Sequence, residues 1–209
     1  MEKKQSFNKI DFKIITIGDP YVGKTAIIRR YIENKFYVNH SNIVGITKFE
    51  KEIILKNKEK IYLNLIDTMG QEKYQSMNKQ YVRNVDAVLF VFDLSRKETL
   101  MNVKMWIKFF NENFNGEKEI PKYLIGNKKD LKKDVDDDDI YIFKEDNEDL
   151  IYKETSAKEE DNQINDLFQE MGELLYQKYK KYNNIKTKNI KLSVSNCEKK
   201  SSQCIKCLV

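Results

Sequence analysis

The chain has 209 residues, of which 40% are apolar and 34% are charged, and its formal net charge is +5. This length and composition fit one ordinary domain followed by a tail, and they argue against a chain that is disordered throughout. The longest apolar run, residues 87–92, is far shorter than the ~20 residues of a membrane-spanning helix. All three cysteines lie within the last 13 residues, so a disulfide-stapled secreted scaffold is excluded as well.

The positive charge is concentrated at one end of the chain. Residues 178–209 contain nine lysines and a single acidic residue, whereas the remainder of the chain carries a small negative net charge. A core that binds nucleic acid is therefore not expected, but a basic tail that finds an anionic surface is. The charged N-terminal residues lack the apolar segment of a secretory signal peptide, and we expect a reducing, cytosolic setting.

Strand-like and helix-like segments alternate along the chain. Strands are predicted, from apolar and β-branched runs, at residues 12–17, 49–55, 61–66, 85–92, 120–125 and 150–152. Helices are predicted, from apolar periodicity, at residues 24–34, 98–114 and 162–179. The five aspartates within residues 134–139 are expected to begin another helix, the alternative being a Ca²⁺ cluster, whose ligand spacing they lack.

This order predicts an α/β fold with a mostly parallel six-stranded sheet, one antiparallel hairpin strand and helices on both faces. Ligands of such sheets bind at the carboxyl ends of the strands. Trp106 is expected to serve packing rather than a site. Because the apolar period fails after Tyr182, we expect one domain over residues 8–180 and a disordered basic tail over residues 181–209.

Residues 18–25, GDPYVGKT, match the pattern G-x-x-x-x-G-K-[ST] between a predicted strand and a predicted helix. In such a loop the glycines let backbone N–H groups wrap a polyphosphate, the lysine reaches the β- and γ-phosphates, and the hydroxyl coordinates Mg²⁺. Lys24 and Thr25 occupy the last two positions. The residues expected to line the phosphates are Gly18, Asp19, Pro20, Tyr21, Val22, Gly23, Lys24, Thr25 and Ala26.

The segment DTMGQE directly follows the predicted strand at residues 61–66. Asp67 is expected to hold Mg²⁺ together with Thr25, the Gly70 N–H to meet a γ-phosphate, and Gln71 to orient the attacking water. A DxxG turn is a weak signal alone, but this one stands about 40 residues after the phosphate loop, as phosphate sensing requires.

Two further segments, NKKD at residues 127–130 and ETSAK at residues 154–158, follow the last two predicted strands. The Asp130 carboxylate can accept hydrogen bonds from the N1–H and the exocyclic amine of guanine together, a donor pair that adenine lacks. Together the segments predict GTP and GDP as ligands rather than ATP. The residues expected at the guanine are Asn127, Lys128, Asp130, Ser156, Ala157 and Lys158.

With these motifs, the sequence resembles the small GTPases of the Ras superfamily, and most of all the Rab family, over residues 8–180. The Rab likeness rests on DTMGQEKY at residues 67–74, FDLS at residues 92–95, NVKMW at residues 102–106 and the cysteine-bearing tail. The resemblance implies a P-loop small G domain and a GTPase that is slow without an activating protein. It also places Phe36 edge-on to the guanine, unless that ring packs in the core.

The resemblance further implies a monomeric molecular switch in vesicle and membrane trafficking, with Lys24 and Gln71 as the catalytic residues. Its expected partners are an exchange factor, an activating protein and effectors. Its expected location is the cytosolic face of an intracellular membrane, from which it cycles to the cytosol.

The sequence departs from the family pattern in the first switch segment, before the DxxG aspartate and in the phosphate loop. Ile43 stands where the family has a threonine that binds Mg²⁺, and Ile66 stands where Rab proteins have a tryptophan. Pro20 and Tyr21 replace small residues of the phosphate loop. These departures leave two alternatives: a pseudo-GTPase that acts as a nucleotide-binding interaction module with weak switching, or a Ras-type signalling GTPase.

Cys204 and Cys207 follow the lysine-rich segment, which is the layout by which Rab-like proteins carry prenyl groups. The four-residue C-a-a-X pattern is not met, and the two cysteines are not adjacent. We expect lipidation at one or both cysteines, with free thiols as the alternative. Zinc is not expected, because this CxxC has no partner pair.

Overall fold

The computed structural model describes residues 9–37, 47–68, 79–116 and 118–204, with side chains described up to residue 184. The elements in chain order are β1 (Asp11–Ile17), α1 (Lys24–Glu33), β2 (Thr47–Ile54), β3 (Lys60–Asp67), the 3₁₀ helix η2 (Lys79–Tyr81), β4 (Ala87–Asp93), α2 (Lys97–Asn113), β5 (Lys122–Asn127), α3 (Asp137–Glu145), β6 (Leu150–Glu154) and α4 (Gln163–Cys204).

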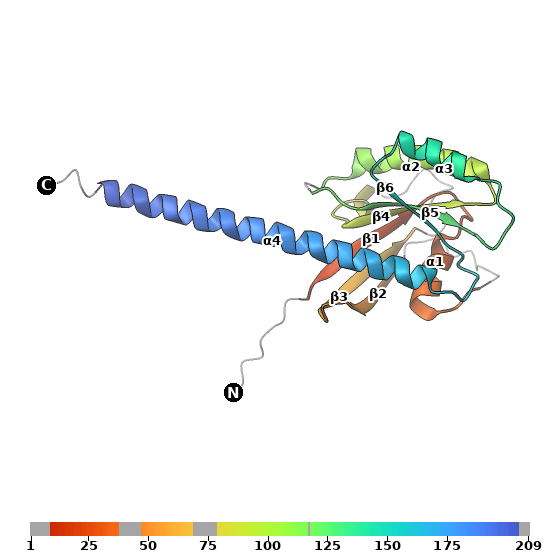
Figure 1. The fold of residues 1–209 in the computed structure, drawn as a ribbon, viewed down its shortest axis with the longest axis horizontal. Coiled ribbons are helices and arrows are strands. Elements are labelled where there is room, and N and C mark those ends of the chain that lie inside the picture. Colours follow the sequence, from red (N-terminus) through yellow and green to blue (C-terminus); the bar gives the residue numbers. More distant parts are fainter. Residues whose placement is uncertain (1–8, 38–46, 69–78, 117, 205–209) are drawn as a thin grey trace, which may run out of the picture.

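The strands form one six-stranded sheet in the order β2-β3-β1-β4-β5-β6. β2 pairs antiparallel with β3, and all other pairs are parallel. Helices α1 and α4 cover one face of the sheet, and α2 and α3 cover the other (Figure 1). The predicted α/β fold with one antiparallel hairpin strand is confirmed, and apart from the end of α4 the predicted boundaries lie within two residues of those observed.

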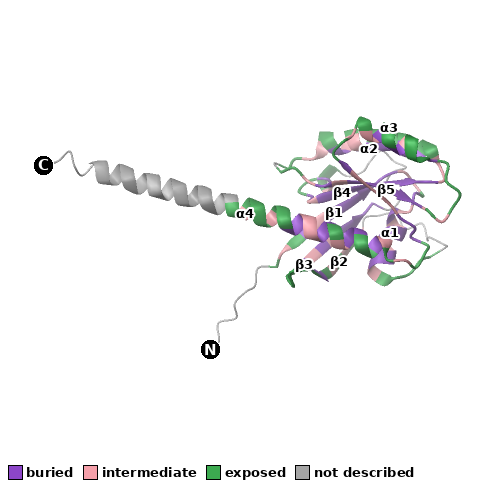
Figure 2. Ribbon diagram, viewed as in Figure 1, coloured by how far each residue is buried: buried purple, intermediate pink, exposed green. Residues whose placement is uncertain are grey.

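Burial follows from each strand's place in the sheet. All seven residues of the central strand β4 are buried, because helices cover both of its faces. The edge strand β2 alternates instead between exposed and partly buried residues over most of its length. Two apolar cores result, one under α1 and α4 and the other under α2 and α3 (Figure 2).

The last helix is longer than the sequence predicts. The apolar period predicts an end at residue 179, but α4 continues to Cys204 and projects beyond the sheet (Figure 1). No glycine or proline occurs after Gly172, so no residue of the tail breaks a helix, and its many lysines are good helix formers. In the described part of the chain, no helix has the length and apolarity needed to cross a bilayer.

Candidate nucleotide-binding site

The phosphate loop connects the carboxyl end of β1 to the start of α1. Its two glycines have positive φ angles, 155° at Gly18 and 99° at Gly23. A Cβ atom on Gly18 would lie 2.1 Å from the Val91 carbonyl oxygen, and one on Gly23 would lie 2.2 Å from Asn127 Nδ2. Glycine is therefore required at both ends of the loop, for its backbone angles and for close packing.

The ammonium group of Lys24 lies inside the loop. Lys24 is buried, and its Nζ donates hydrogen bonds to the carbonyl oxygens of Gly18 at 2.9 Å and Asp19 at 2.7 Å. Because α1 begins at Lys24, the N–H groups of its first turn open onto the same loop. The positive charge and the N–H groups together suit a polyphosphate.

Thr25 and Asp67 meet across the loop, although they are far apart in sequence. Thr25 Oγ1 donates a hydrogen bond of 3.1 Å to Asp67 Oδ1 at the end of β3, where Asp67 is 0% exposed. Hydroxyl and carboxylate oxygens are the donor type that Mg²⁺ prefers. Of the other predicted residues here, Gly70, Gln71 and Ile43 lie outside the described residues.

Asn127 joins three loops at the carboxyl edge of the sheet. Its Nδ2 donates to the Val22 carbonyl oxygen at 2.8 Å, and its Oδ1 accepts from Thr155 Oγ1 at 3.2 Å and from the Ala157 N–H at 3.3 Å. The phosphate loop and the two predicted guanine segments are thus held together by one buried amide. The structure brings together segments that the sequence separates by more than a hundred residues.

The Asp130 carboxylate is fixed by the segment after β6. Ser156 Oγ donates to Asp130 Oδ1 at 2.7 Å, and Lys158 Nζ lies 3.8 Å from Asp130 Oδ2. The Ser156 hydroxyl in turn accepts hydrogen bonds from the N–H groups of Lys158 and Glu159. This arrangement holds a carboxylate in one orientation, which recognition of a planar donor pair requires.

Lys128 adopts a left-handed conformation, with φ 65°, and its Nζ donates to Asp93 Oδ2 at 2.6 Å. Asp93, at the end of β4, is 1% exposed and also accepts hydrogen bonds from Ser95 and Arg96. Burial alone would raise the pKa of Asp93, but these hydrogen bonds outweigh burial and hold the pKa below its usual value. Asp93 is therefore an ionised anchor for Lys128.

Several contacts at the site were not predicted from the sequence. Arg30 of α1 donates to the carbonyl oxygens of Ala157 and Lys158, each at 3.0 Å. Trp106 packs in the core as predicted, but its Nε1 also donates to Asp19 Oδ1 at 2.8 Å, and Asn102 Nδ2 donates to Asp19 Oδ2 at 2.7 Å. Helical spacing puts residues 102 and 106 on one face of α2, but it does not reveal what that face meets.

Phe36 follows α1 and is exposed, and it belongs to neither apolar core. Core packing, the alternative to guanine contact, is therefore wrong for this ring. Contact with a guanine stays a prediction.

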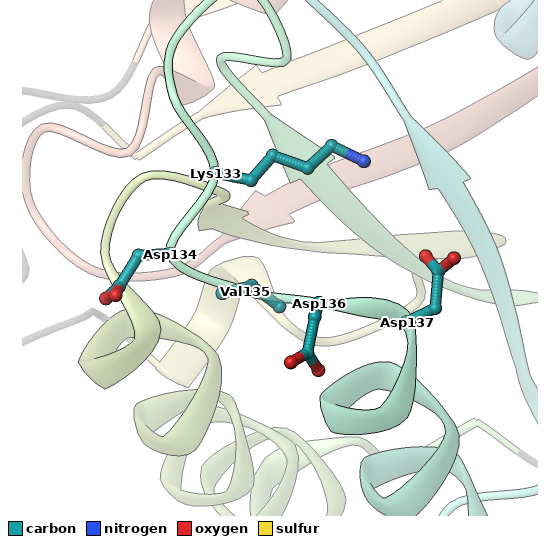
Figure 3. A pocket seen from close by; sticks show the side chains of 5 residues that line it. All are labelled: Lys133, Asp134, Val135, Asp136 and Asp137. Carbon is teal, nitrogen blue, oxygen red and sulfur yellow. The ribbon is translucent and has the colours of Figure 1, made fainter.

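The aspartates before α3 form its start, as predicted. Asp136 is the N-cap of α3, and its side chain and that of Asp139 form a capping box. Figure 3 shows the pocket lined by residues 133–137, in which the carboxylates of Asp134, Asp136 and Asp137 point in different directions. Among the described residues, no group of His, Cys, Asp or Glu is arranged to hold a metal ion by itself.

Comparison with known proteins agrees with the assignment of a nucleotide-binding site. Residues 13–177 match the model of the Ras family. The chain is 33% identical to the Ras-related protein RabH of Dictyostelium discoideum, over 87% of this chain and 90% of that protein. It is also 33% identical to the Ras-related protein SEC4 of Saccharomyces cerevisiae, over 83% of this chain and 79% of that protein. It is 37% identical to the Ras-related protein Rab-33A of Mus musculus, over 71% of this chain and 62% of that protein. The chain therefore belongs to the Ras family, as a Rab-like small GTPase that binds guanine nucleotides and hydrolyses GTP.

Proposed function

We propose that this GTPase is a Rab-type switch of membrane trafficking that works on the cytosolic face of an intracellular membrane. The observation that carries this proposal is the end of α4, where a lysine-rich segment leads to Cys204 and Cys207. The Rab names of the relatives point the same way. A Ras-type signalling GTPase would share the chemistry and differ in its membrane and partners.

In this proposal the carboxyl edge of the sheet holds the nucleotide. The phosphates lie in the loop at residues 18–25, against Lys24. The guanine lies between Asn127, Asp130 and the segment at residues 156–158. Support comes from the hydrogen bonds that Asn127 makes to Val22 and Ala157, since one side chain links the phosphate loop to the guanine segments.

We propose that Thr25 and Asp67 hold Mg²⁺, which when bound would offset negative charge on the β- and γ-phosphates. Their side-chain oxygens are already within 3.1 Å of each other, so little rearrangement is needed for both to face one ion. Thr25→Val keeps the shape and removes the oxygen.

This variant should release GDP about as fast in Mg²⁺ as the wild type does in a chelator. Thr155→Val, which removes a hydroxyl from the guanine side, is the matched control and should keep its Mg²⁺ response. GDP release from Thr25→Val that slows with Mg²⁺ as much as the wild type's does would contradict the assignment.

Catalysis in this proposal is positioning and electrostatics. Lys24 stabilises the developing negative charge, and Gln71 orients water. Intrinsic turnover of such sites is on the order of 10⁻⁴ to 10⁻³ s⁻¹ and rises when a partner supplies an arginine. The proposal therefore includes an activating protein, an exchange factor and effectors, with the chain itself as a monomer.

The tail supplies membrane binding. From Tyr182, whose ring lies against Lys118 Nζ, about 22 helical residues lead to Cys204 and span roughly 33 Å. One lipid chain gives only marginal anchoring, so a second chain or the lysines must contribute. Each lysine near an anionic leaflet adds about 1 kcal/mol, which falls with salt.

The test is the location and intact mass of the protein in its own cell. The variant carrying both Cys204→Ser and Cys207→Ser should move from the membrane fraction to the cytosol, whereas Cys197→Ser, the matched control, should not. Wild-type protein from the membrane fraction should carry at least one lipid mass. Membrane-bound protein with both cysteines unmodified would refute the proposal.

A further inference from the structure

One carboxylate of the phosphate loop is bound from outside the loop. Asp19 Oδ1 accepts a hydrogen bond of 2.8 Å from Trp106 Nε1, and Asp19 Oδ2 accepts one of 2.7 Å from Asn102 Nδ2. Both donors belong to α2 and are four residues apart, so they lie on one face of the helix. These three side chains are called the Asp19–α2 contact below.

The α2 side of this contact is anchored in the apolar core through Trp106, whereas Asn102 is exposed. Val103 and Phe110 of α2 are buried in the core, and Trp106 is 8% exposed, with its ring against Phe109. The first turn of α2 is held as well, because Thr99 Oγ1 accepts from the N–H of Asp93 at 2.9 Å. The contact therefore ties the loop to the framework of the fold.

The loop side of the contact touches the residue that faces the phosphates. The main-chain oxygen of Asp19 accepts a hydrogen bond from Lys24 Nζ, while the side chain of the same residue is held by α2. A shift of α2 that moves Asp19 would therefore also move the carbonyl oxygen to which the Lys24 ammonium is hydrogen-bonded.

The loop also contains a residue in an unfavourable conformation. Tyr21 has φ 64°, and its side chain is 67% exposed. A left-handed tyrosine persists only where its surroundings hold it. Pro20, just before it, has no N–H to donate to a phosphate. The loop thus depends on contacts beyond its own sequence.

We infer that Asn102 and Trp106 are positioning residues, which hold the phosphate loop in its binding conformation through Asp19 and thereby slow nucleotide release. The inference rests on the assignment of residues 18–25 to the phosphates, and it is independent of the trafficking role.

The experiment measures release of a fluorescent GDP analogue from the full chain after addition of excess GDP. Asn102→Asp places a second carboxylate against Asp19, so release should accelerate about tenfold, the effect of losing one hydrogen bond to a charged group. When Asp19→Asn is added to it, the new amide can donate to the new carboxylate at position 102 and still accept from Trp106. The double variant should therefore return to within about twofold of wild type.

Two further variants separate positioning from folding. Trp106→Phe keeps an aromatic ring at this position but removes the N–H donor, so release should accelerate several-fold, and the melting temperature measured alongside reports the cost of the smaller ring. Met105→Leu alters an exposed residue of the same helix and should release GDP at the wild-type rate.

The outcomes are distinguishable. Release at the wild-type rate from Asn102→Asp, or no slowing when Asp19→Asn is added to it, would overturn the positioning role. A substitution of Lys24 that leaves GDP binding intact would instead overturn the assignment of the phosphate loop itself.

Discussion

Single side chains hold the nucleotide site by binding main-chain atoms of a neighbouring loop. Asn127 binds the Val22 carbonyl oxygen, and Arg30 binds those of Ala157 and Lys158. A net hydrogen bond contributes about 1 kcal/mol, and a buried group left without its partner costs more than that. These side chains therefore hold neighbouring loops together through hydrogen bonds within the protein itself.

At this scale the first prediction concerns base selectivity. Wild-type protein should bind GDP far more tightly than ADP. Asp130→Asn replaces one acceptor by a donor, so it should weaken GDP binding by about tenfold or more and improve binding of xanthosine diphosphate, whose ring reverses that pairing. Competition against a fluorescent nucleotide measures all three affinities.

Asp134→Asn, outside the guanine segments, is the control and should keep wild-type selectivity. Equal affinities for GDP and ADP would contradict the guanine assignment.

The sequence patterns predicted the nucleotide-binding motifs, but they did not predict every side chain that is hydrogen-bonded to the residues of those motifs. The spacing of GDPYVGKT, NKKD and ETSAK is local information, and the parallel sheet brings these segments to one edge. The partners of Asp19 could not be predicted, because apolar periodicity assigns Trp106 to the core and leaves exposed Asn102 on the solvent side. Their hydrogen bonds depend on how α2 docks, which no local pattern encodes.

Between elements, the buried carboxylate of Asp93 links β4, the start of α2 and the loop after β5. It accepts hydrogen bonds from Lys128 and Arg96, and Arg96 is the N-cap residue of α2. Truncating one partner of such a buried group leaves the others with uncompensated charge. The helix that carries Asn102 and Trp106 is thus tied to the guanine segment as well.

The prediction at the scale of elements is a pH dependence. The pKa of Asp93 is lowered in the folded protein, so its contribution to stability is present above the unfolded value of 3.8 and is lost as pH falls through the folded pKa. Asp93→Asn should lower the free energy of unfolding at pH 7 by about 1–3 kcal/mol. The difference from wild type should shrink below about pH 4.

Denaturant unfolding at several pH values measures this difference. Glu148→Gln, at an exposed turn position, should differ little from wild type at any pH. A deficit in Asp93→Asn that persists unchanged at pH 3 would show that lost shape, and not lost charge, is responsible.

Across the whole molecule, α4 has two parts with different surroundings. Its first part is core: Phe168, Met171 and Leu175 are buried, and the Tyr31 ring stacks on Phe168 with centroids 4.1 Å apart. The packing ends with edge contact between Tyr179 and Phe12 and with Lys118 over the Tyr182 ring. The apolar period of the sequence predicted the first part. Beyond it, the composition shows only that no apolar face is left to pack against the domain, and this does not decide whether the backbone is helical.

This division predicts the effect of truncation. A chain ending at Asn184 keeps every described side-chain contact of α4, so it should melt within a few degrees of the full chain and release GDP at the same rate. A chain ending at Leu174 loses buried Leu175 and Tyr176, together with Tyr179. Each buried side chain of this size contributes about 1.5–3 kcal/mol, so the loss is a large fraction of the ~5–15 kcal/mol of a typical domain. Thermal unfolding with bound GDP compares the chains. If the chain ending at Asn184 melts far below the full chain, residues 185–209 stabilise the domain directly, and the domain does not end near residue 180.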